Sequence, residues 1–496
     1  MSALGPVRAF VGVASGSAES ALVARTHRGT HAVLATRLLS IACTAASITI
    51  LARLIPPGDF GLWAMAGVPL GMMTIMREFG LGSAIVREHT LTAEQQDAYF
   101  WTSVGVSVAT AMLLALAAPL LASFYGDSLL RPVIWACCAA LPIMGIGLVH
   151  VALLRRSLRY DKLVVVEGGG MVCGVLAGLA GAYLWRDVWA LVAGYIASAS
   201  WMSASALVLC RWRPGLPRVR GNGIKLSFSV QVALSNLLTF AGNNVGLVVG
   251  YRLPAAELGY YNRGQQLYNL AQFALLTPIT EVGFALLCRL GTDEASRRAF
   301  IALARRVAIL FIPYAVVLPI VSADLVRAVL GPAWTPAGPV LACFAPAVLA
   351  QALAALLAQL LVSQGRGKVL RNWAAVDVVL RTVGALLGSR FGVVGIAAGF
   401  SLAALLSVPL LAWRVSQSGP VRLRDQIEAL LPGTVVAAAA LLAATAVALA
   451  EAALGLQPGW ERLLFIGGSA VLGWSLVCAA WPQARDALLG RGVAHA

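Results

Sequence analysis

Long apolar stretches recur along almost the whole chain, and they constrain its fold more than any other feature. Fourteen such windows can be placed between residues 31 and 481 of the 496. A helix needs about 20 apolar residues to cross a bilayer, so each window is long enough for one crossing. Within lipid, every backbone N–H and C=O group must be bonded inside its own segment, and helices satisfy this requirement. We therefore expect an all-α polytopic membrane protein with about 14 transmembrane helices.

The windows lie at residues 31–53, 60–83, 97–122, 130–153, 162–184, 187–210, 226–250, 264–288, 299–322, 334–362, 369–389, 391–413, 428–450 and 461–481. Fourteen crossings use about 280 residues, which leaves about 15 residues for each connection. Charged residues make up 12% of the chain, about half of their share in soluble domains. These values exclude a water-soluble globule, a disordered chain and an enzyme with an aqueous catalytic domain.

Basic residues alternate between the connections and predict the orientation of the chain. Of the 37 Lys and Arg residues, 28 fall in the N-terminal tail, the even-numbered connections and the C-terminal tail, whereas eight fall in the odd-numbered connections. Basic residues collect on the cytoplasmic side of membrane helices, so both termini are expected in the cytoplasm. The net charge of +16 is then explained by orientation signals that touch anionic membrane lipids. We expect no nucleic-acid partner.

The eight cysteines lie in or beside apolar stretches, and they form no Cys-x-x-Cys motif or Cys/His cluster. A cysteine in such a position is usually a small apolar residue. We therefore expect no metal site and no cofactor, although coupling to a proton or sodium gradient stays open.

Two pairs of similar segments indicate an internal repeat. Pro56–Trp63 and Pro254–Tyr261 both read Pro-x-x-acid-apolar-Gly-apolar-aromatic, 198 residues apart. Val188–Tyr195 and Val393–Phe400 match at an offset of 205 residues. Each copy would contain six helices and therefore share one orientation, as in transporters whose repeats are related by an axis along the membrane normal. Two such lobes can rock about a midplane cavity, which is the physical basis of alternating access.

This repeat predicts the organisation of the chain. It consists of a cytoplasmic or interfacial tail (1–30), an N-lobe (31–210), a basic cytoplasmic linker (211–225), a C-lobe (226–414), two extra helices (426–482) and a cytoplasmic tail (483–496).

Several segments together resemble one transporter family. They are Ile50–Leu54, Phe79–Arg87, Leu154–Tyr160, Trp189–Gly194 and Leu258–Arg263. In these segments the chain resembles the Wzx-type polysaccharide flippases of the multidrug/oligosaccharidyl-lipid/polysaccharide exporter superfamily. The resemblance implies a transporter of the bacterial inner membrane that moves undecaprenyl-pyrophosphate-linked sugar repeat units from the cytoplasmic to the periplasmic leaflet. Such units supply exopolysaccharide or lipopolysaccharide synthesis, and polymerase and chain-length proteins of the same pathway are candidate partners.

The chain departs from the family in the seventh and eighth helices. In the eighth, it lacks a Pro that members often have near Phe284–Leu286. Members often have an acidic residue in the seventh helix, three residues beyond an Asn that matches Asn243–Asn244, where this chain has no acid. The resemblance therefore does not support ion coupling through that carboxylate.

Arginines in or near the apolar windows are the candidates for holding a diphosphate. An uncompensated charge at the bilayer centre costs at least about 2.5–3.5 kcal/mol, so a flippase must replace water with fixed cations and donors. The planar guanidinium binds phosphate through two hydrogen bonds. The candidates are Arg263, Arg381, Arg53, Arg252 and Arg77. Snorkelling to the membrane interface is the competing explanation for Arg53 and Arg252.

Three acidic residues in apolar windows are candidates for ion coupling. Asp377 precedes Arg381 by four residues, which places both side chains on one helix face as an ion pair. The pair is either a neutralised structural pair or a switch. Glu281 and Glu167 stand alone in their windows, and each is either a silent protonated acid or a proton or sodium site.

Amides and aromatic rings complete the set of candidate cavity residues: Asn236, Asn243, Asn244, Tyr260 and Tyr261. Amides can bond sugar hydroxyls, but they also hold membrane helices together. Tyrosines can stack on sugar rings, but they also form interfacial belts.

Two other functions compete with a flippase. A multidrug or small-metabolite antiporter of the same superfamily would need acids for cationic substrates. A membrane polysaccharide polymerase or ligase would need a long outer loop with catalytic Arg or His, and no odd-numbered connection is longer than about 15 residues. We therefore expect a transporter and not an enzyme.

Overall fold

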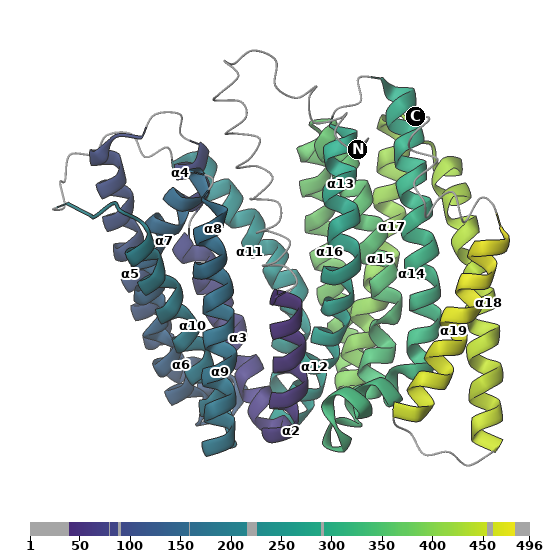
Figure 1. Ribbon diagram of the computed structural model, residues 1–496, viewed down its shortest axis with the longest axis horizontal. Coiled ribbons are helices and arrows are strands. Elements are labelled where there is room, and N and C mark those ends of the chain that lie inside the picture. Colours follow the sequence, from purple (N-terminus) through teal and green to yellow (C-terminus); the bar gives the residue numbers. More distant parts are fainter. Residues whose placement is uncertain are drawn as a thin grey trace.

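The computed structural model describes residues 39–78, 80–87, 91–157, 159–215, 226–288, 292–453 and 460–481. Within these ranges the chain is helical almost throughout and contains no strand (Figure 1). Ten helical segments of this part are long and apolar enough to cross a membrane. The prediction of an all-α polytopic membrane protein is confirmed. The predicted tails (1–30 and 483–496) and residues 216–225 of the predicted linker lie outside the described residues.

The first half of the chain forms the following helices. They are a helix over Leu39–Leu54 that contains the π-helical η2 (Ser47–Leu51) and α2 (Ala52–Leu54), then α3 (Pro57–Glu78), α4 (Leu81–Arg87), α5 (Ala93–Tyr125), α6 (Leu130–Cys138), α7 (Ala140–Arg156), α8 (Tyr160–Leu163), η3 (Val164–Gly168), α9 (Gly169–Leu184) and α10 (Val188–Leu209).

The second half continues the helical pattern. Its helices are α11 (Leu226–Val249), η4 (Gly250–Arg252), α12 (Ala255–Ala271), η5 (Gln272–Leu276), α13 (Thr277–Leu287), α14 (Asp293–Leu330), η6 (Pro332–Trp334), α15 (Ala337–Ser363), α16 (Gly367–Gly388), η7 (Ser389–Phe391), α17 (Gly392–Ser418), α18 (Leu423–Ala453) and α19 (Trp460–Ala480).

Packing sorts the helices into three sets (Figure 1). Helices α5, α6, α7, α9 and α10 pack with one another, and we call this set with α3 and α4 the N-lobe. Helices α11 to α17 form a second set, which we call the C-lobe. Helices α18 and α19 pack together against α14, on the far side of the C-lobe from the N-lobe. The Leu39–Leu54 helix contacts α9 in one lobe and α14 in the other.

Large apolar side chains cover much of the outer surface. Leu116 and Phe391 are each 80% exposed, and Leu449 is 73% exposed. Such side chains are stable when they face lipid chains and not water. This surface fits the membrane environment that the apolar windows predict.

Two glycines let the lobes touch closely where α3 crosses α12. A methyl group placed on Gly61 would lie 1.6 Å from the carbonyl oxygen of Ala255, and one placed on Gly259 would lie 2.1 Å from that of Pro57. Positions 57 and 61 become 255 and 259 when 198, the offset of the first repeat pair, is added. The contact is therefore reciprocal: Gly61 lies against Ala255, and Gly259 lies against Pro57.

Further contacts between distant segments lie at the same end of the molecule, which we call the closed end. Trp334 donates a hydrogen bond to the carbonyl oxygen of Ala52 at 2.6 Å. Arg53 donates one to the carbonyl oxygen of Ala328 at 2.7 Å. Phe124 of the N-lobe stacks on Tyr251 of the C-lobe, with ring centroids 4.6 Å apart. Both lobes are thus joined at this end by backbone, polar and aromatic contacts.

One predicted boundary is wrong in a way that affects the site. The window expected at 264–288 begins nine residues earlier as a helix, since α12 starts at Ala255. The residues between include Glu257, Asn262 and Arg263, which lower the local hydropathy, although polar side chains are stable in a membrane helix where they face the protein interior. Arg263 therefore lies inside a helix and not at its beginning.

Candidate substrate cavity

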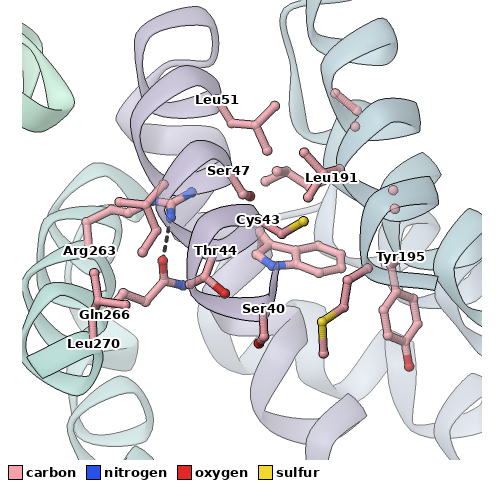
Figure 2. Close-up of a pocket in the computed structure, with 18 of the residues that line it drawn as sticks. Ser40, Cys43, Thr44, Ser47, Leu51, Leu191, Tyr195, Arg263, Gln266 and Leu270 are labelled. Carbon is pink, nitrogen blue, oxygen red and sulfur yellow. Dashed lines mark hydrogen bonds between the residues drawn. The ribbon is translucent and has the colours of Figure 1, made fainter. Parts of the chain in front are cut away.

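A cavity of about 580 Å³ lies between the two lobes (Figure 2). Its walls come from the Leu39–Leu54 helix, α3, α9 and α10 on one side and from α12 and η5 on the other. Pockets of about 300–1,000 Å³ are typical of small-molecule sites. The space is therefore large enough for a diphosphate with an attached sugar.

Arg263 is the charged residue of this cavity. Its side chain is 4% exposed, and its guanidinium lies over the ring of Phe60, 3.8 Å from the centroid. Nη1 donates a hydrogen bond to the amide oxygen of Gln266, one turn along α12. Nε is buried and has no hydrogen-bond partner within the described residues. The aromatic contact holds the guanidinium in place, while the unpartnered donor is left for an anion.

Figure 2 shows Arg263 and Gln266 facing the helix that bears a row of hydroxyl groups. The hydroxyls belong to Ser40, Thr44 and Ser47, which are spaced by four and three residues and share one helix face. Sequence reasoning missed these residues, although their helical spacing within an apolar window was a usable signal. They add donors and acceptors that could bond a sugar.

The charge of the lining matters for the choice of substrate. Among the described residues that line the cavity, Arg263 is charged and none is Asp or Glu. A buried cation without a carboxylate favours an anionic ligand over a cationic one.

Asp377 and Arg381 form the predicted ion pair, but away from this cavity. Arg381 Nε lies 2.8 Å from Asp377 Oδ2, and both residues are buried in α16. The guanidinium lies 4.7 Å from the ring centroid of Phe400, which packs edge-on against Phe344. The pair therefore sits within the C-lobe, and neither residue lines the cavity.

Replacing only one partner of this ion pair should destabilise the protein more than replacing both partners with apolar residues. Asp377→Asn leaves a buried guanidinium uncompensated, which typically costs about 3–5 kcal/mol, whereas replacing a whole buried pair with apolar residues is often neutral. We expect a marked fall in the thermal midpoint of the purified Asp377→Asn variant and recovery in Asp377→Leu/Arg381→Met. Arg424→Met, which removes an exposed pair with Glu428, is the control and should leave the midpoint unchanged. An unchanged midpoint for Asp377→Asn would contradict a structural role.

The other candidate arginines lie outside the inter-lobe cavity. Arg53 and Arg252 are exposed at the closed end. Arg77, at the end of α3, is only 3% exposed and lines a separate pocket within the N-lobe, whose walls also come from α4, α7 and α10. Of the five predicted arginines, Arg263 alone lines the inter-lobe cavity.

The predicted tyrosines and the amides of Asn243 and Asn244 do not line the cavity either. Tyr261 is fully buried and packs edge-on against Phe344, so its ring belongs to the core and cannot stack on a sugar. Tyr260 packs against Trp334 with ring centroids 6.0 Å apart. Asn244 donates to the carbonyl oxygen of Phe240 in its own helix.

The remaining two predicted amides are Asn243 and Asn236. The backbone carbonyl of Asn243 accepts a hydrogen bond from Gln265 at 2.7 Å. The side chain of Asn236 lies outside the described part of the structure.

The two acids expected to stand alone differ in their surroundings. Glu167 is not alone, because Arg155 lies 2.7 Å from its carboxylate. Sequence distance concealed this pair, whose members come from α7 and η3. Glu281 is exposed on α13. No group of three or more metal-ligating side chains occurs in the described parts of the chain.

Comparison with known proteins places the chain in a family. The family described as "Polysaccharide biosynthesis protein" matches residues 50–339, which is more than half of the chain. The chain belongs to this polysaccharide biosynthesis family. The predicted resemblance to Wzx-type exporters of the multidrug/oligosaccharidyl-lipid/polysaccharide superfamily is confirmed.

Curated relatives of this family member cover most of its length. It is 22% identical to the lipopolysaccharide biosynthesis protein WzxC of Escherichia coli, over 73% of this chain and 75% of the relative. It is 21% identical to the teichuronic acid biosynthesis protein TuaB of Bacillus subtilis, over 84% and 88%. It is 24% identical to the succinoglycan biosynthesis transport protein ExoT of Rhizobium meliloti, over 70% and 71%.

Two solved structures share the fold of this polysaccharide biosynthesis protein. The lipid II flippase MurJ in an inward closed conformation superposes with a TM-score of 0.71 at 11% identity, covering 92% of this chain and 98% of MurJ. An inward-facing multidrug transporter of the MATE family superposes with a TM-score of 0.60 at 13% identity, covering 76% and 95%. At these identities the likeness shows the fold alone.

Proposed function

We propose that this chain is a flippase that moves undecaprenyl-pyrophosphate-linked oligosaccharide units from the cytoplasmic to the periplasmic leaflet of the bacterial inner membrane. The observation that carries the proposal is the inter-lobe cavity with a buried, incompletely bonded Arg263 and no lining carboxylate among the described residues. The names of the relatives, which refer to polysaccharide synthesis and transport, support the same substrate class. The activity is transport and not catalysis.

In this proposal Arg263 binds the diphosphate while the lipid tail stays in the membrane. A guanidinium bonds phosphate oxygens strongly because both partners are charged. Gln266 and the hydroxyls of Ser40, Thr44 and Ser47 bond the first sugar. The fixed donors replace the water that the diphosphate loses on entering the slab of hydrocarbon.

We also propose that the chain crosses the membrane 14 times, as two six-helix repeats plus α18 and α19. The segment Gly367–Gln417 contains α16 and α17, which pack on each other and would form two crossings. The other three crossings would be formed by the Leu39–Leu54 helix, α11 and the stretch from α12 to α13. The reciprocal contact of Gly61 and Gly259 supports the repeat.

The lobes would rock about the inter-lobe cavity to alternate access. On the charge pattern the closed end faces the periplasm, and both termini face the cytoplasm. Opening the contact between α3 and α12 would release the substrate outward. Coupling to a proton or sodium gradient, with Asp377, Glu281 or Glu167 as the titrating group, is part of the proposal. We also propose that the protein cooperates with polymerase and chain-length proteins of the same pathway.

Deletion of the gene tests the function in cells. We expect loss of the polymer together with accumulation of carrier-linked repeat units in the inner membrane, because synthesis of the units continues while their export stops. A plasmid copy should restore the polymer. Normal polymer in the deletion strain, with a new sensitivity to toxic cations, would favour the antiporter instead.

A further inference from the structure

A second pocket, of about 210 Å³, lies inside the N-lobe. It is formed at the junction of α3, α4, α7 and α10, and Arg77, Arg155 and Met144 are among its lining residues. This pocket lies within one lobe, unlike the inter-lobe cavity. Neither the proposed transport step nor the packing of the lobes makes use of it.

Arg77 is buried in this pocket without a matching anion. Its exposed fraction is 3%, and its ion-pair contact among the described residues is Nη2 to Glu78 Oε1 at 3.5 Å. Glu78 is itself 62% exposed, so its carboxylate is largely solvated. Nε and Nη1 of Arg77 have no hydrogen-bond partner within the described residues. A buried charge with unbonded donors is unfavourable unless a ligand supplies the acceptors.

A second arginine and the inter-lobe cavity both lie next to this pocket. Arg155 lines the pocket, is 57% exposed and pairs with Glu167 at 2.7 Å, so it contributes a partly neutralised cation. Met144 lines the pocket, and its sulfur accepts a hydrogen bond from the hydroxyl of Tyr195 at 3.9 Å. Tyr195 also lines the inter-lobe cavity. The two spaces are therefore separated by the Tyr195–Met144 contact.

We infer that the Arg77 pocket binds a phosphate group and is a second anion site, beside the inter-lobe cavity. The free donors of Arg77 match phosphate oxygens, because guanidinium and phosphate form short charge-assisted hydrogen bonds. The choice of phosphate among anions rests on the proposed function, which brings a diphosphate into the adjacent cavity. The phosphate comes either from that diphosphate or from the headgroup of a membrane phospholipid, and the two sources are separated below.

Binding stoichiometry tests the inference. The probe is radiolabelled farnesyl diphosphate, dialysed to equilibrium against the full-length chain in an uncharged detergent. We expect two molecules bound to the wild type, one to Arg77→Met, one to Arg263→Met and none to the double variant. Arg131→Met, which removes an exposed arginine above Trp135, is the matched control and should bind two. Wild-type stoichiometry in Arg77→Met, or no binding to Arg263→Met, would overturn the second site.

The two single variants, Arg77→Met and Arg263→Met, also separate this inference from the proposed function. If only Arg263→Met binds less farnesyl diphosphate than the wild type, the transport site is supported and the Arg77 site is contradicted. If only Arg77→Met binds less, the Arg77 site is supported and the transport site is contradicted. In the Arg263→Met background, displacement of the probe by dioctanoyl phosphatidylglycerol identifies a phospholipid headgroup as a ligand. Displacement by inorganic phosphate alone identifies the phosphate group as sufficient.

Thermal stability distinguishes a binding arginine from a merely structural one. Arg77→Met preserves much of the side-chain length and removes a buried charge whose carboxylate neighbour, Glu78, is largely solvated. In buffer without phosphate its midpoint should therefore equal or exceed that of the wild type. Saturating phosphate should raise the midpoint of the Arg263→Met variant but not that of Arg77→Met/Arg263→Met. A lower midpoint of Arg77→Met without phosphate, combined with an unchanged stoichiometry, would assign Arg77 to structure.

Discussion

Replacing Arg263 with methionine should lower polymer export about 100-fold, because an uncompensated charge within the membrane costs at least about 2.5–3.5 kcal/mol and each 1.36 kcal/mol is a factor of ten. Methionine fills similar space above Phe60 but offers no donors to a diphosphate. The measurement is the rate of polymer appearance in a deletion strain that expresses the variant at wild-type level.

Two further variants make the Arg263 result specific. Arg263→Lys keeps the charge but loses the planar pair of donors, so its export should fall between those of the wild type and Arg263→Met. Arg131→Met removes an exposed arginine from α6 and should export normally. Normal export by Arg263→Met would show that the cation of the inter-lobe cavity has no part in transport.

A single methyl group at Gly61 or Gly259 should force the closed end open. The new carbon would lie 1.6 Å or 2.1 Å from a carbonyl oxygen of the other lobe, far inside van der Waals contact. Overpacking typically costs about 1–3 kcal/mol, which would shift the balance between closed and separated lobes by about 5- to 150-fold. We therefore expect Gly61→Ala and Gly259→Ala to spend more time open to the periplasm and to export at least about fivefold less polymer.

Cys43 provides a native reporter of this opening, because it lines the inter-lobe cavity. With the other seven cysteines replaced by alanine, a membrane-impermeant maleimide added outside should label Cys43 slowly in the parent and quickly in Gly61→Ala and Gly259→Ala. Gly67→Ala is the matched control on α3, since a methyl group there meets nothing within 4 Å. Equal labelling in all four proteins would contradict the assignment of this contact as the outer gate.

The features that could be predicted from the sequence are local ones. Apolar length is a property of each window by itself, so membrane helices could be recognised without knowledge of their neighbours. The pair of Asp377 and Arg381 depends on a spacing of four residues within one helix, and the structure contains it. The offset between Pro56–Trp63 and Pro254–Tyr261 relates two segments that meet at the closed end.

The features that could not be predicted depend on which way each helix faces. Tyr261 and Arg263 were assigned to one cavity, yet residues two apart in a helix point about 200° apart. The structure accordingly has Tyr261 in the core and Arg263 in the cavity. The late helix boundary at residue 264 concealed this conflict. The burial of Arg77 and the pairing of Glu167 with Arg155 arise from packing between separate helices, which hydropathy does not report.

Transport by the purified chain is the most direct measurement. The full-length protein would be reconstituted into vesicles whose inner leaflet contains a fluorescent undecaprenyl-pyrophosphate-linked oligosaccharide, and arrival in the outer leaflet would be followed with a membrane-impermeant quencher. We predict that vesicles with the wild type expose the sugar on both sides, and that vesicles with Arg263→Met behave as protein-free ones. Equal exposure with and without the wild-type protein would contradict the assignment of this chain as a flippase.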